Sequence, residues 1–409
     1  MLFGGADSVG DGAVTSYDRW LAWKHGAQLR ERALRSKFAD DRLSAEELDW
    51  GDQSTLEEFV AFIAPDAEAV VMSFYDELFT RVPGVRKLFP ADLTVQRDRL
   101  LAALLALVAG GARPSALAVE LEQLGRDHRK YGVRTAQYQA VGQALLAALA
   151  RHGGRHWTPA VERAWAARYS AAATVMRQAA DQDQDRPPFW YGTVVGREVH
   201  GWDVAILRVR PHQPYPYVAG QYATLESPRL PRVWRPYSMA TAPIADQALE
   251  FHVRAAGRGG LSDALAASEP GDVVRIGPPQ GSVTLNRIEE RPLLFVAGGT
   301  GWSTVKALLT QCARESSPSV SSRLLVSCRP GEPYDPAFGP FVRRLPNLGT
   351  TLVHSAEELR AELAPDRLTN RDVDAFVSGP PGLVATATRL LHTAGVPHTR
   401  IHHDEPLSV

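Results

Sequence analysis

A tetrapeptide at positions 235–238, Arg-Pro-Tyr-Ser, combines side chains that a flavin dinucleotide needs. Arginine offers a planar fork for pyrophosphate oxygens, tyrosine a stacking face for the isoalloxazine, and serine a donor near the redox-active ring edge. A later glycine turn precedes a short helical segment, whose free N–H groups could bind the same pyrophosphate. The tetrapeptide alone is common and also suits a strand of an unrelated barrel, but in this order it predicts an FAD site. The candidate FAD-binding residues are Tyr222, Arg235, Pro236, Tyr237, Ser238, Gly260, Leu261 and Ser262.

A second candidate site is the stretch FVAGGTGWS at 295–303, which predicts a strand, a glycine-rich turn and a helix start. Glycines let the backbone approach the phosphates of a dinucleotide, although the usual G-x-G-x-x-G fingerprint is absent. The Gly-Pro-Pro-Gly turn after Ser378 ends a later strand, so both turns could face one nicotinamide. Arg329 could contact a 2′-phosphate and favour NADPH, or could be an exposed arginine without that role. The candidate nucleotide-binding residues are Gly299, Thr300, Gly301, Trp302, Ser303, Thr304, Arg329, Gly379 and Pro380.

The first half of the chain holds aromatic, amide and imidazole side chains within helical segments. Gln96 stands one helical turn before Leu100, on the same face. His128, ten residues before Tyr138, could ligate iron through a neutral imidazole. Each residue has an ordinary alternative, because a lone histidine in a helix is usually a surface residue and Tyr75 could pack in any helical bundle. These residues alone therefore do not decide whether the chain has a haem site.

The elements that would position these residues fall into three zones. Composition changes at the stretch DQDQDRPP, 181–188, and again near Arg291. Helical periodicity fills the first zone, over Glu57–Ile63, Asp66–Thr80, Arg97–Val108, Ser115–Tyr131, Tyr138–His152 and Val161–Ala180. Short β-branched strands separated by Pro and Gly predict an antiparallel barrel, over Gly192–Glu198, Val204–Val209, Tyr222–Glu226 and Leu249–Val253. Apolar strands alternating with helices then predict a parallel sheet, with strands Leu293–Ala297, Leu324–Ser327, Leu352–His354 and Ala375–Ser378 and helices Thr304–Ala313 and Leu383–Ala394.

Bulk properties exclude several classes of protein. The formal net charge of -1 gives no bulk attraction to nucleic acid, so no nucleic-acid partner is expected. Two cysteines, Cys312 and Cys328, cannot form a disulfide framework and suit a reducing cytoplasm. The N-terminus has no signal-peptide pattern, and the most apolar stretch, Leu100–Gly110, is too short to span a bilayer. We therefore expect a cytoplasmic protein.

The first 50 residues pose a separate question. Tyr17–Lys37 could form a helix with Trp20 and Trp23 amid basic residues, and Ser44–Glu47 matches a capping box for a short turn. We expect an extension that packs on its own helical domain; a docking helix for a partner is the alternative.

The residues from about Phe189 to Val409 together resemble the ferredoxin–NADP reductase family, an FAD-binding barrel followed by a nucleotide-binding α/β domain. That resemblance implies the FAD and nicotinamide contacts named above. Two of the chain's departures from the family pattern lie at its glycine turns. Many relatives have cysteine where this chain has Ser378, and proline where it has Thr304. Hydride transfer is therefore expected to be slower or different.

The residues from about Leu56 to Ala180 resemble the globin domain of flavohaemoglobins, because the order and spacing of their aromatic, glutamine and histidine residues follow that family. The resemblance implies that His128 ligates haem iron, that Phe89 wedges the haem and that Leu100 restricts the pocket. It also implies that Tyr75 and Gln96 donate hydrogen bonds on the distal side and that Tyr138 supports His128. A proximal glutamate of the family falls at Ala180, and its neighbour Asp181 points about 100° away on a regular helix. The proximal relay is therefore expected to be incomplete.

The combined resemblance implies a multidomain chain: an all-α globin, an antiparallel β-barrel FAD domain, and an α/β parallel-sheet nucleotide-binding domain. The expected boundaries are 1–50 extension, 51–182 globin, 183–188 linker, 189–288 FAD barrel and 289–409 NAD(P) domain. Electrons would pass from NADH or NADPH through FAD to haem b in a monomer that binds O₂ and nitric oxide and oxidises nitric oxide to nitrate. Two alternatives stay open: an NAD(P)H-dependent haem or quinone reductase or oxidase, and an O₂- or redox-sensing haem protein.

Overall fold

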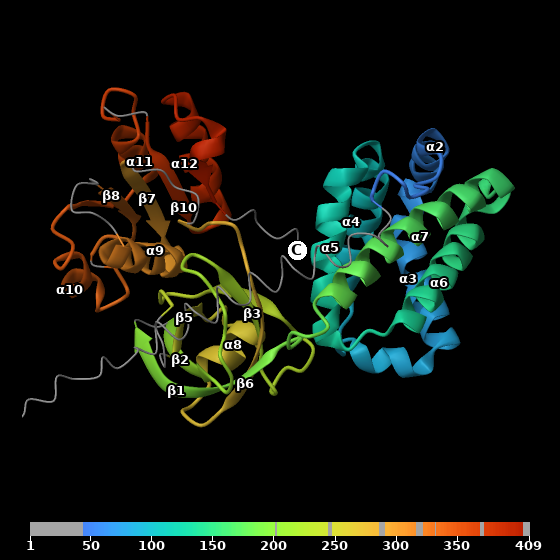
Figure 1. Ribbon diagram of the computed structural model, residues 1–409, viewed down its shortest axis with the longest axis horizontal. Helices are drawn as coiled ribbons and strands as arrows, with labels where there is room; N and C mark the ends of the chain where they lie inside the picture. The colour runs from blue at the N-terminus through green and yellow to red at the C-terminus, as the bar shows by residue number, and fades with distance from the viewer. Residues whose placement is uncertain are drawn as a thin grey trace, which may run out of the picture.

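The computed structural model describes residues 44–200, 203–243, 248–285, 291–315, 322–331, 333–368 and 372–403. A helical domain, an antiparallel barrel and a layered α/β domain follow one another along the chain (Figure 1). The barrel contacts both neighbours, through Lys130 and Thr224 on one side and through His252 and Tyr334 on the other. The predicted fold class is therefore confirmed.

The helical domain contains six α-helices in its described part, joined by short 3-10 turns. Capping residues mark the starts of two of these helices. The Asp52 carboxylate accepts a hydrogen bond from Thr55 N at 2.7 Å at the start of α2. Helix α7 begins with the Thr158 hydroxyl as its cap and with Pro159 as its first residue. Apolar faces bury Leu56, Trp165 and their neighbours in one core. The helices are α2 (Gln53–Ile63), α3 (Ala67–Arg81), α4 (Thr94–Ala109), α5 (Pro114–His128), α6 (Thr135–Gly153) and α7 (Pro159–Gln182).

Helices α5 and α7 meet backbone to backbone. A Cβ atom at Gly125 would lie 2.2 Å from the Met176 carbonyl oxygen, so only glycine permits this approach. His128 ends the same helix α5, three residues further on. The contact therefore fixes the position of His128 along α7, the last helix of the domain.

Arg168 of α7 is a buried clamp within the helical domain. Its guanidinium donates to the carbonyl oxygens of Trp50 at 2.5 Å and Leu107 at 2.7 Å, and to Gln53 Oε1 at 2.8 Å. These bonds satisfy a charge that is completely buried. Arg168 thereby ties the start of the domain to the end of α4 and to the last helix.

The barrel is a six-stranded antiparallel sheet with strand order β4-β3-β6-β1-β2-β5. A single bridge from Met239 to Phe251 joins its two edges, so the sheet closes on a core that includes Leu207 and Leu225. Strands β4 and β6 were not predicted. The elements are β1 (Trp190–His200), β2 (Val204–Pro211), β3 (Tyr222–Glu226), β4 (Arg235–Ser238), β5 (Leu249–Arg254), α8 (Leu261–Ala266) and β6 (Val273–Gln280).

The third domain is a parallel five-stranded sheet with strand order β11-β10-β7-β8-β9. The chain runs outward from β7 to β9 and then returns to the other side of β7, so the strand order reverses between β7 and β10. Ligands bind beyond the carboxyl ends of the strands at such a reversal. The elements are β7 (Leu293–Gly298), α9 (Trp302–Glu315), β8 (Ser322–Ser327), α10 (Phe338–Val342), β9 (Leu348–Val353), α11 (Ala356–Glu362), β10 (Asp374–Ser378), α12 (Pro381–Thr393) and β11 (Ile401–His402).

The expected N-terminal helix Tyr17–Lys37 lies outside the described residues. Ser44–Glu47 forms a turn in which Ser44 N donates to Glu47 Oε2 at 2.6 Å, half of the predicted capping box. Among the described residues, no helix has the length and apolar character to cross a membrane. The predicted domain boundaries stay a prediction.

Candidate functional site

The carboxyl ends of β7 and β10 bring the two glycine turns together. A Cβ at Gly301 would lie 2.3 Å from the Ser378 carbonyl oxygen, and one at Gly379 would lie 3.0 Å from the Gly298 carbonyl oxygen. Gly299 adopts a φ of +51°, the left-handed region that favours glycine. The expectation that both turns lie at one sheet edge is thereby met by the geometry, and helix α9 begins there.

The side chains of three predicted nucleotide-binding residues do not face this edge freely. Trp302, Ser303 and Thr304 are each buried to within 2% of complete burial. The Trp302 ring packs on Phe338 at 5.0 Å and its indole N–H donates to Asp335 Oδ2 at 2.8 Å. Apolar packing took these side chains into the domain core, so only their backbone is left for a nucleotide.

Arg254 is a cation at this edge that sequence reasoning missed. It ends strand β5, and its Nη1 lies 3.4 Å from the position of a Cβ on Gly299. The guanidinium also pairs with Asp203 at 3.2 Å. A cation beside a glycine turn suits the pyrophosphate of a dinucleotide. Arg329, the predicted 2′-phosphate contact, is exposed just after β8.

Strand β4 is the predicted FAD tetrapeptide itself. Its pairing with β3 sets Tyr222 opposite Ser238 and Leu225 opposite Arg235. Burial raises the pKa of Tyr237 to about 12, so its hydroxyl stays protonated. Burial and the nearby charge of Arg99 lower the pKa of Arg235. Two cations converging from separate domains suit a phosphate-bearing ligand at this strand.

The glycine turn before α8 differs from expectation. The Asp263 carboxylate accepts the N–H groups of Gly257 and Arg258, each at 2.8 Å, and of Gly260 at 3.1 Å. The Gly260 amide is therefore already used within the turn. Of the predicted loop residues, Leu261 and Ser262 remain as backbone donors at the start of α8.

The helical domain docks on the barrel beside His128. Lys130 is buried and donates to the Thr224 hydroxyl at 3.2 Å, and its ammonium lies 5.4 Å from the centre of the Trp234 ring. Gln280 of the barrel donates to the Asp127 carboxylate. Trp234 directly precedes the tetrapeptide, so this interface joins the candidate iron ligand to the candidate flavin strand. Sequence reasoning missed Lys130, because no local motif marks it.

His128 is poised as a neutral ligand at the end of α5. Its Nδ1 lies 2.7 Å from the Leu124 carbonyl oxygen, and no described residue bonds to Nε2. Burial lowers the pKa of His128, against the hydrogen bond with Leu124 and the charge of Asp127. A neutral imidazole with one nitrogen oriented by a carbonyl is the usual iron ligand of globins. The residues therefore fit a haem.

The expected distal residues come together on α3 and α4. The Tyr75 hydroxyl donates to the Gln96 carbonyl oxygen at 3.1 Å, and Phe89 packs edge-on against Tyr75 at 5.7 Å. Gln96 Oε1 is buried without a hydrogen-bond partner among the described residues. Leu100 packs against the same core. An unpartnered buried amide oxygen is costly unless a bound molecule satisfies it, which fits a ligand pocket at this place.

The proximal side departs from a carboxylate relay. The Tyr138 ring lies 6.4 Å from that of His128, and the Tyr138 carbonyl oxygen accepts the Tyr169 hydroxyl at 2.6 Å. Burial raises the pKa of Tyr138, Arg177 lowers it and Asp181 raises it. Helix α7 stays regular to Gln182, with Asp181 exposed, yet Asp181 acts on Tyr138 through its charge.

Comparisons with known proteins agree with this architecture. A family model described as Globin matches residues 72–176, and one described as Oxidoreductase FAD-binding domain matches residues 192–285. A flavohemoprotein of Rhodopirellula baltica is 25% identical over 391 residues, which cover 85% of this chain and 95% of that protein. A flavohemoprotein of Bordetella pertussis is 26% identical over 373 residues, covering 82% and 92%.

Two further comparisons concern the reductase half and the whole fold. The ferredoxin–NAD(P)⁺ reductase component of naphthalene 1,2-dioxygenase/salicylate 5-hydroxylase systems from Ralstonia is 31% identical over 226 residues, covering 52% of this chain and 67% of that protein. The crystal structure of a flavohemoglobin from Malassezia yamatoensis with bound FAD and heme superposes with a TM-score of 0.69 at 17% identity, covering 86% and 97%. The latter shows a shared fold.

The fold and both family matches define an oxidoreductase in which a globin domain precedes an FAD-binding reductase module. The relatives that align along most of the chain are flavohemoproteins. The chain is therefore similar to flavohaemoglobins in its globin half and in its reductase half. Its cofactors are haem, FAD and a nicotinamide dinucleotide, and His128, strand β4 and the turns after β7 and β10 are our candidates for holding them.

Proposed function

We propose that this protein is a nitric oxide dioxygenase that draws electrons from NADH or NADPH. The observation that carries the proposal is the contact between Tyr75 and Gln96, two hydrogen-bonding residues on helices other than that of His128. A haem pocket that only passes on electrons has no need of a buried hydrogen-bond donor such as the Tyr75 hydroxyl.

Bound haem supplies O₂ binding and one-electron chemistry; the chain supplies orientation and protons held in place. Burial raises the pKa of Tyr75, against the charge of Arg97, so the hydroxyl remains a donor at every physiological pH. Its acceptor in this structure is the backbone carbonyl oxygen of Gln96. The side-chain Oε1 of Gln96 is buried without a hydrogen-bond partner among the described residues.

On the reductase side, Arg254 and the start of α9 would hold the dinucleotide, and Arg235 the flavin pyrophosphate. Lys130 and Trp234 would keep the two redox halves in contact. Each nitrate formed consumes one nitric oxide, one O₂ and one electron, so one NAD(P)H supports two turnovers and returns NAD(P)⁺ and a proton.

The test is nitric oxide consumption by the holoprotein with NAD(P)H and O₂, followed by an electrode and by nitrate analysis. We expect nitric oxide to accelerate NAD(P)H oxidation with nitrate as product. Tyr75→Phe should lower turnover about 10²-fold, the usual cost of one preorganised donor, with haem and FAD content unchanged. Tyr217→Phe, which removes a buried hydroxyl of the barrel, is the matched control.

Three outcomes contradict the proposal. O₂ consumption with peroxide release that nitric oxide does not change would indicate an oxidase. Rapid reduction of a quinone without nitrate formation would indicate a reductase. Ligand binding without NAD(P)H turnover would indicate a sensor.

A further inference from the structure

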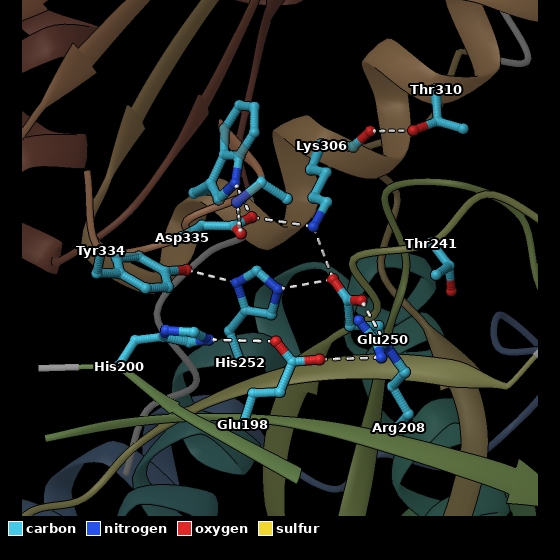
Figure 2. Close-up of polar contacts among 12 residues, drawn as sticks. Glu198, His200, Arg208, Thr241, Glu250, His252, Lys306, Thr310, Tyr334 and Asp335 are labelled. Carbon is cyan, nitrogen blue, oxygen red and sulfur yellow. Dashed lines mark hydrogen bonds and ion pairs between the residues drawn. The ribbon is translucent and has the colours of Figure 1, made fainter. Parts of the chain in front are cut away.

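A group of buried and part-buried polar side chains joins the FAD barrel to the nucleotide domain (Figure 2). Strand β5 supplies two members, α9 one, and the loop after β8 two. We call this group the junction network; it consists of Glu250, His252, Lys306, Tyr334 and Asp335. None of these residues belongs to the candidate flavin, haem or nucleotide contacts described above.

His252 is the centre of the junction network. Its side chain has no exposed surface, and both ring nitrogens are engaged. Nδ1 lies 2.5 Å from the Tyr334 hydroxyl of the nucleotide domain, and Nε2 lies 2.9 Å from Glu250 Oε1 of the same strand (Figure 2). One imidazole thus bridges two domains.

Lys306 makes the second bridge. Its ammonium donates to Glu250 Oε1 at 2.8 Å and to Asp335 Oδ2 at 2.9 Å. Asp335 also accepts the Trp302 indole N–H at 2.8 Å and the Ala337 amide at 2.9 Å. Buried charges whose partners are all in place allow only one relative position of the two domains, because any displacement leaves a charge unpaired.

The junction network fixes the very elements that would hold the dinucleotide. Lys306 lies in the second turn of α9, directly after the glycine turn 299–301. Tyr334 lies in the loop after β8. On the barrel side, Arg254 follows His252 by two residues and reaches Gly299. A network that holds α9 and the β8 loop on β5 therefore sets where the nicotinamide end can reach.

Hydride transfer depends steeply on such placement. The reacting atoms must approach to about 3–3.5 Å, and a displacement of about 1 Å can cost about 10²-fold in rate. Nucleotide affinity depends mainly on the glycine turns after β7 and β10, which lie together within the nucleotide domain. The junction network can therefore affect the transfer rate without affecting affinity.

We propose that the junction network positions the nucleotide domain on the FAD barrel for hydride transfer, with His252 and Tyr334 as its positioning residues. Two electrons and one proton leave the reduced nicotinamide together and enter the flavin, and the network exchanges neither. The proposal concerns flavin reduction alone, so it stands or falls independently of nitric oxide as a substrate.

The test compares Tyr334→Phe with Tyr217→Phe in the full-length holoprotein. Both changes remove one tyrosine hydroxyl, but Tyr217 bonds to Thr241 at 3.0 Å within the barrel. Flavin reduction is followed anaerobically by stopped flow over a range of NADH and [4-²H]NADH concentrations. For Tyr334→Phe we expect the limiting rate to fall roughly tenfold with the half-saturating NADH concentration within about twofold, and a changed deuterium isotope effect. Tyr217→Phe should leave all three quantities unchanged.

Hydrogen exchange of the same proteins gives a readout that needs no turnover. The amides of Ala337 and Phe338 bond to Asp335, so they should exchange faster in Tyr334→Phe and not in Tyr217→Phe. His252→Asn is a second variant, expected to give the same fall in limiting rate. A raised half-saturating concentration with an unchanged limiting rate, or an equal loss in Tyr217→Phe, would overturn the proposal.

Discussion

The Ser378 hydroxyl donates a hydrogen bond to the Thr304 hydroxyl at 3.1 Å, which joins the end of β10 to the first turn of α9. At these two positions the family resemblance implies a cysteine and a proline. The two positions therefore form one paired feature, a hydroxyl pair that links the two glycine turns.

Removing either hydroxyl should slow flavin reduction. One neutral hydrogen bond contributes about 0.5–1.5 kcal/mol, which is roughly a 2- to 10-fold effect if it is lost where the nicotinamide lies. Ser378→Ala, Thr304→Val and the double variant form a cycle measured by stopped flow. Because the two share one bond, the double variant should lose little more than either single one. Fully additive losses would show that the pair does not act as a unit.

His128→Ala should abolish stable haem incorporation and leave FAD bound. The reason is that the only imidazole offered by α5 is lost, whereas strand β4 lies in another domain. The Soret absorbance per chain is compared with the flavin absorbance of the same sample. His152→Ala, whose ring lies 2.8 Å from the Ser73 hydroxyl, is the control. An undiminished Soret band in His128→Ala would refute the assignment.

Arg235→Ala should weaken FAD binding and leave the haem spectrum intact. Hydrogen bonds to charged groups contribute about 1.5–3 kcal/mol, so binding should weaken roughly 10- to 100-fold. Flavin stoichiometry at low FAD concentration measures the loss. Arg229→Ala removes an arginine that pairs with Asp272 instead and should retain FAD.

The proximal side can be tested by resonance Raman spectra of the reduced, unliganded protein. Ala180→Glu should raise the iron–histidine stretching frequency, because a hydrogen-bonded carboxylate gives the imidazole more anionic character. The rise should require Tyr138. Since Asp181 raises the pKa of Tyr138, Asp181→Asn should lower that pKa and shift the frequency by itself. No change in either variant would mean that α7 takes no part in tuning His128.

Acid stability should depend on Glu250. Burial opposes ionisation of Glu250, but the hydrogen bond from His252 and the charge of Lys306 outweigh it and lower the pKa from 4.5 to about 2. The native state therefore holds fewer protons than the unfolded state, so this stabilisation is complete above pH 4.5 and is lost as the pH falls toward about 2. Urea unfolding across this range should show a weaker pH dependence in Glu250→Gln. Identical pH dependence in both proteins would contradict the assigned cause.

The sequence predicted long elements well and proline-containing ones badly. Strands β4 and β6 were not predicted because each contains proline, which has no N–H for the hydrogen bonds between strands. Strand β4 accommodates its proline because it lies at the end of the strand order, and β6 carries Pro278 and Pro279 near its own end. The junction network was also missed, since its members come from distant segments. The polar residues Glu250 and His252, alternating on one face of an otherwise apolar strand, were the available signal.

The residue types at the candidate sites were predictable from the sequence, but the orientations of their side chains were not. The glycine turn predicted α9, yet the burial of Trp302 and Thr304 follows from packing against α10 and β10, which no local pattern contains. The same holds for Asp263, whose carboxylate occupies a turn that was expected to bind pyrophosphate.

The Arg168 clamp has a consequence for how the chain is made. The carbonyl oxygen of Trp50 finds its partner on a helix that leaves the ribosome more than a hundred residues later. These contacts of the beginning of the globin half therefore form only after α7 has been synthesised. A nascent chain released before Arg168 would leave that carbonyl and that of Leu107 without their donor. Completion of the globin is thus timed by its last helix, just before synthesis of the reductase half begins.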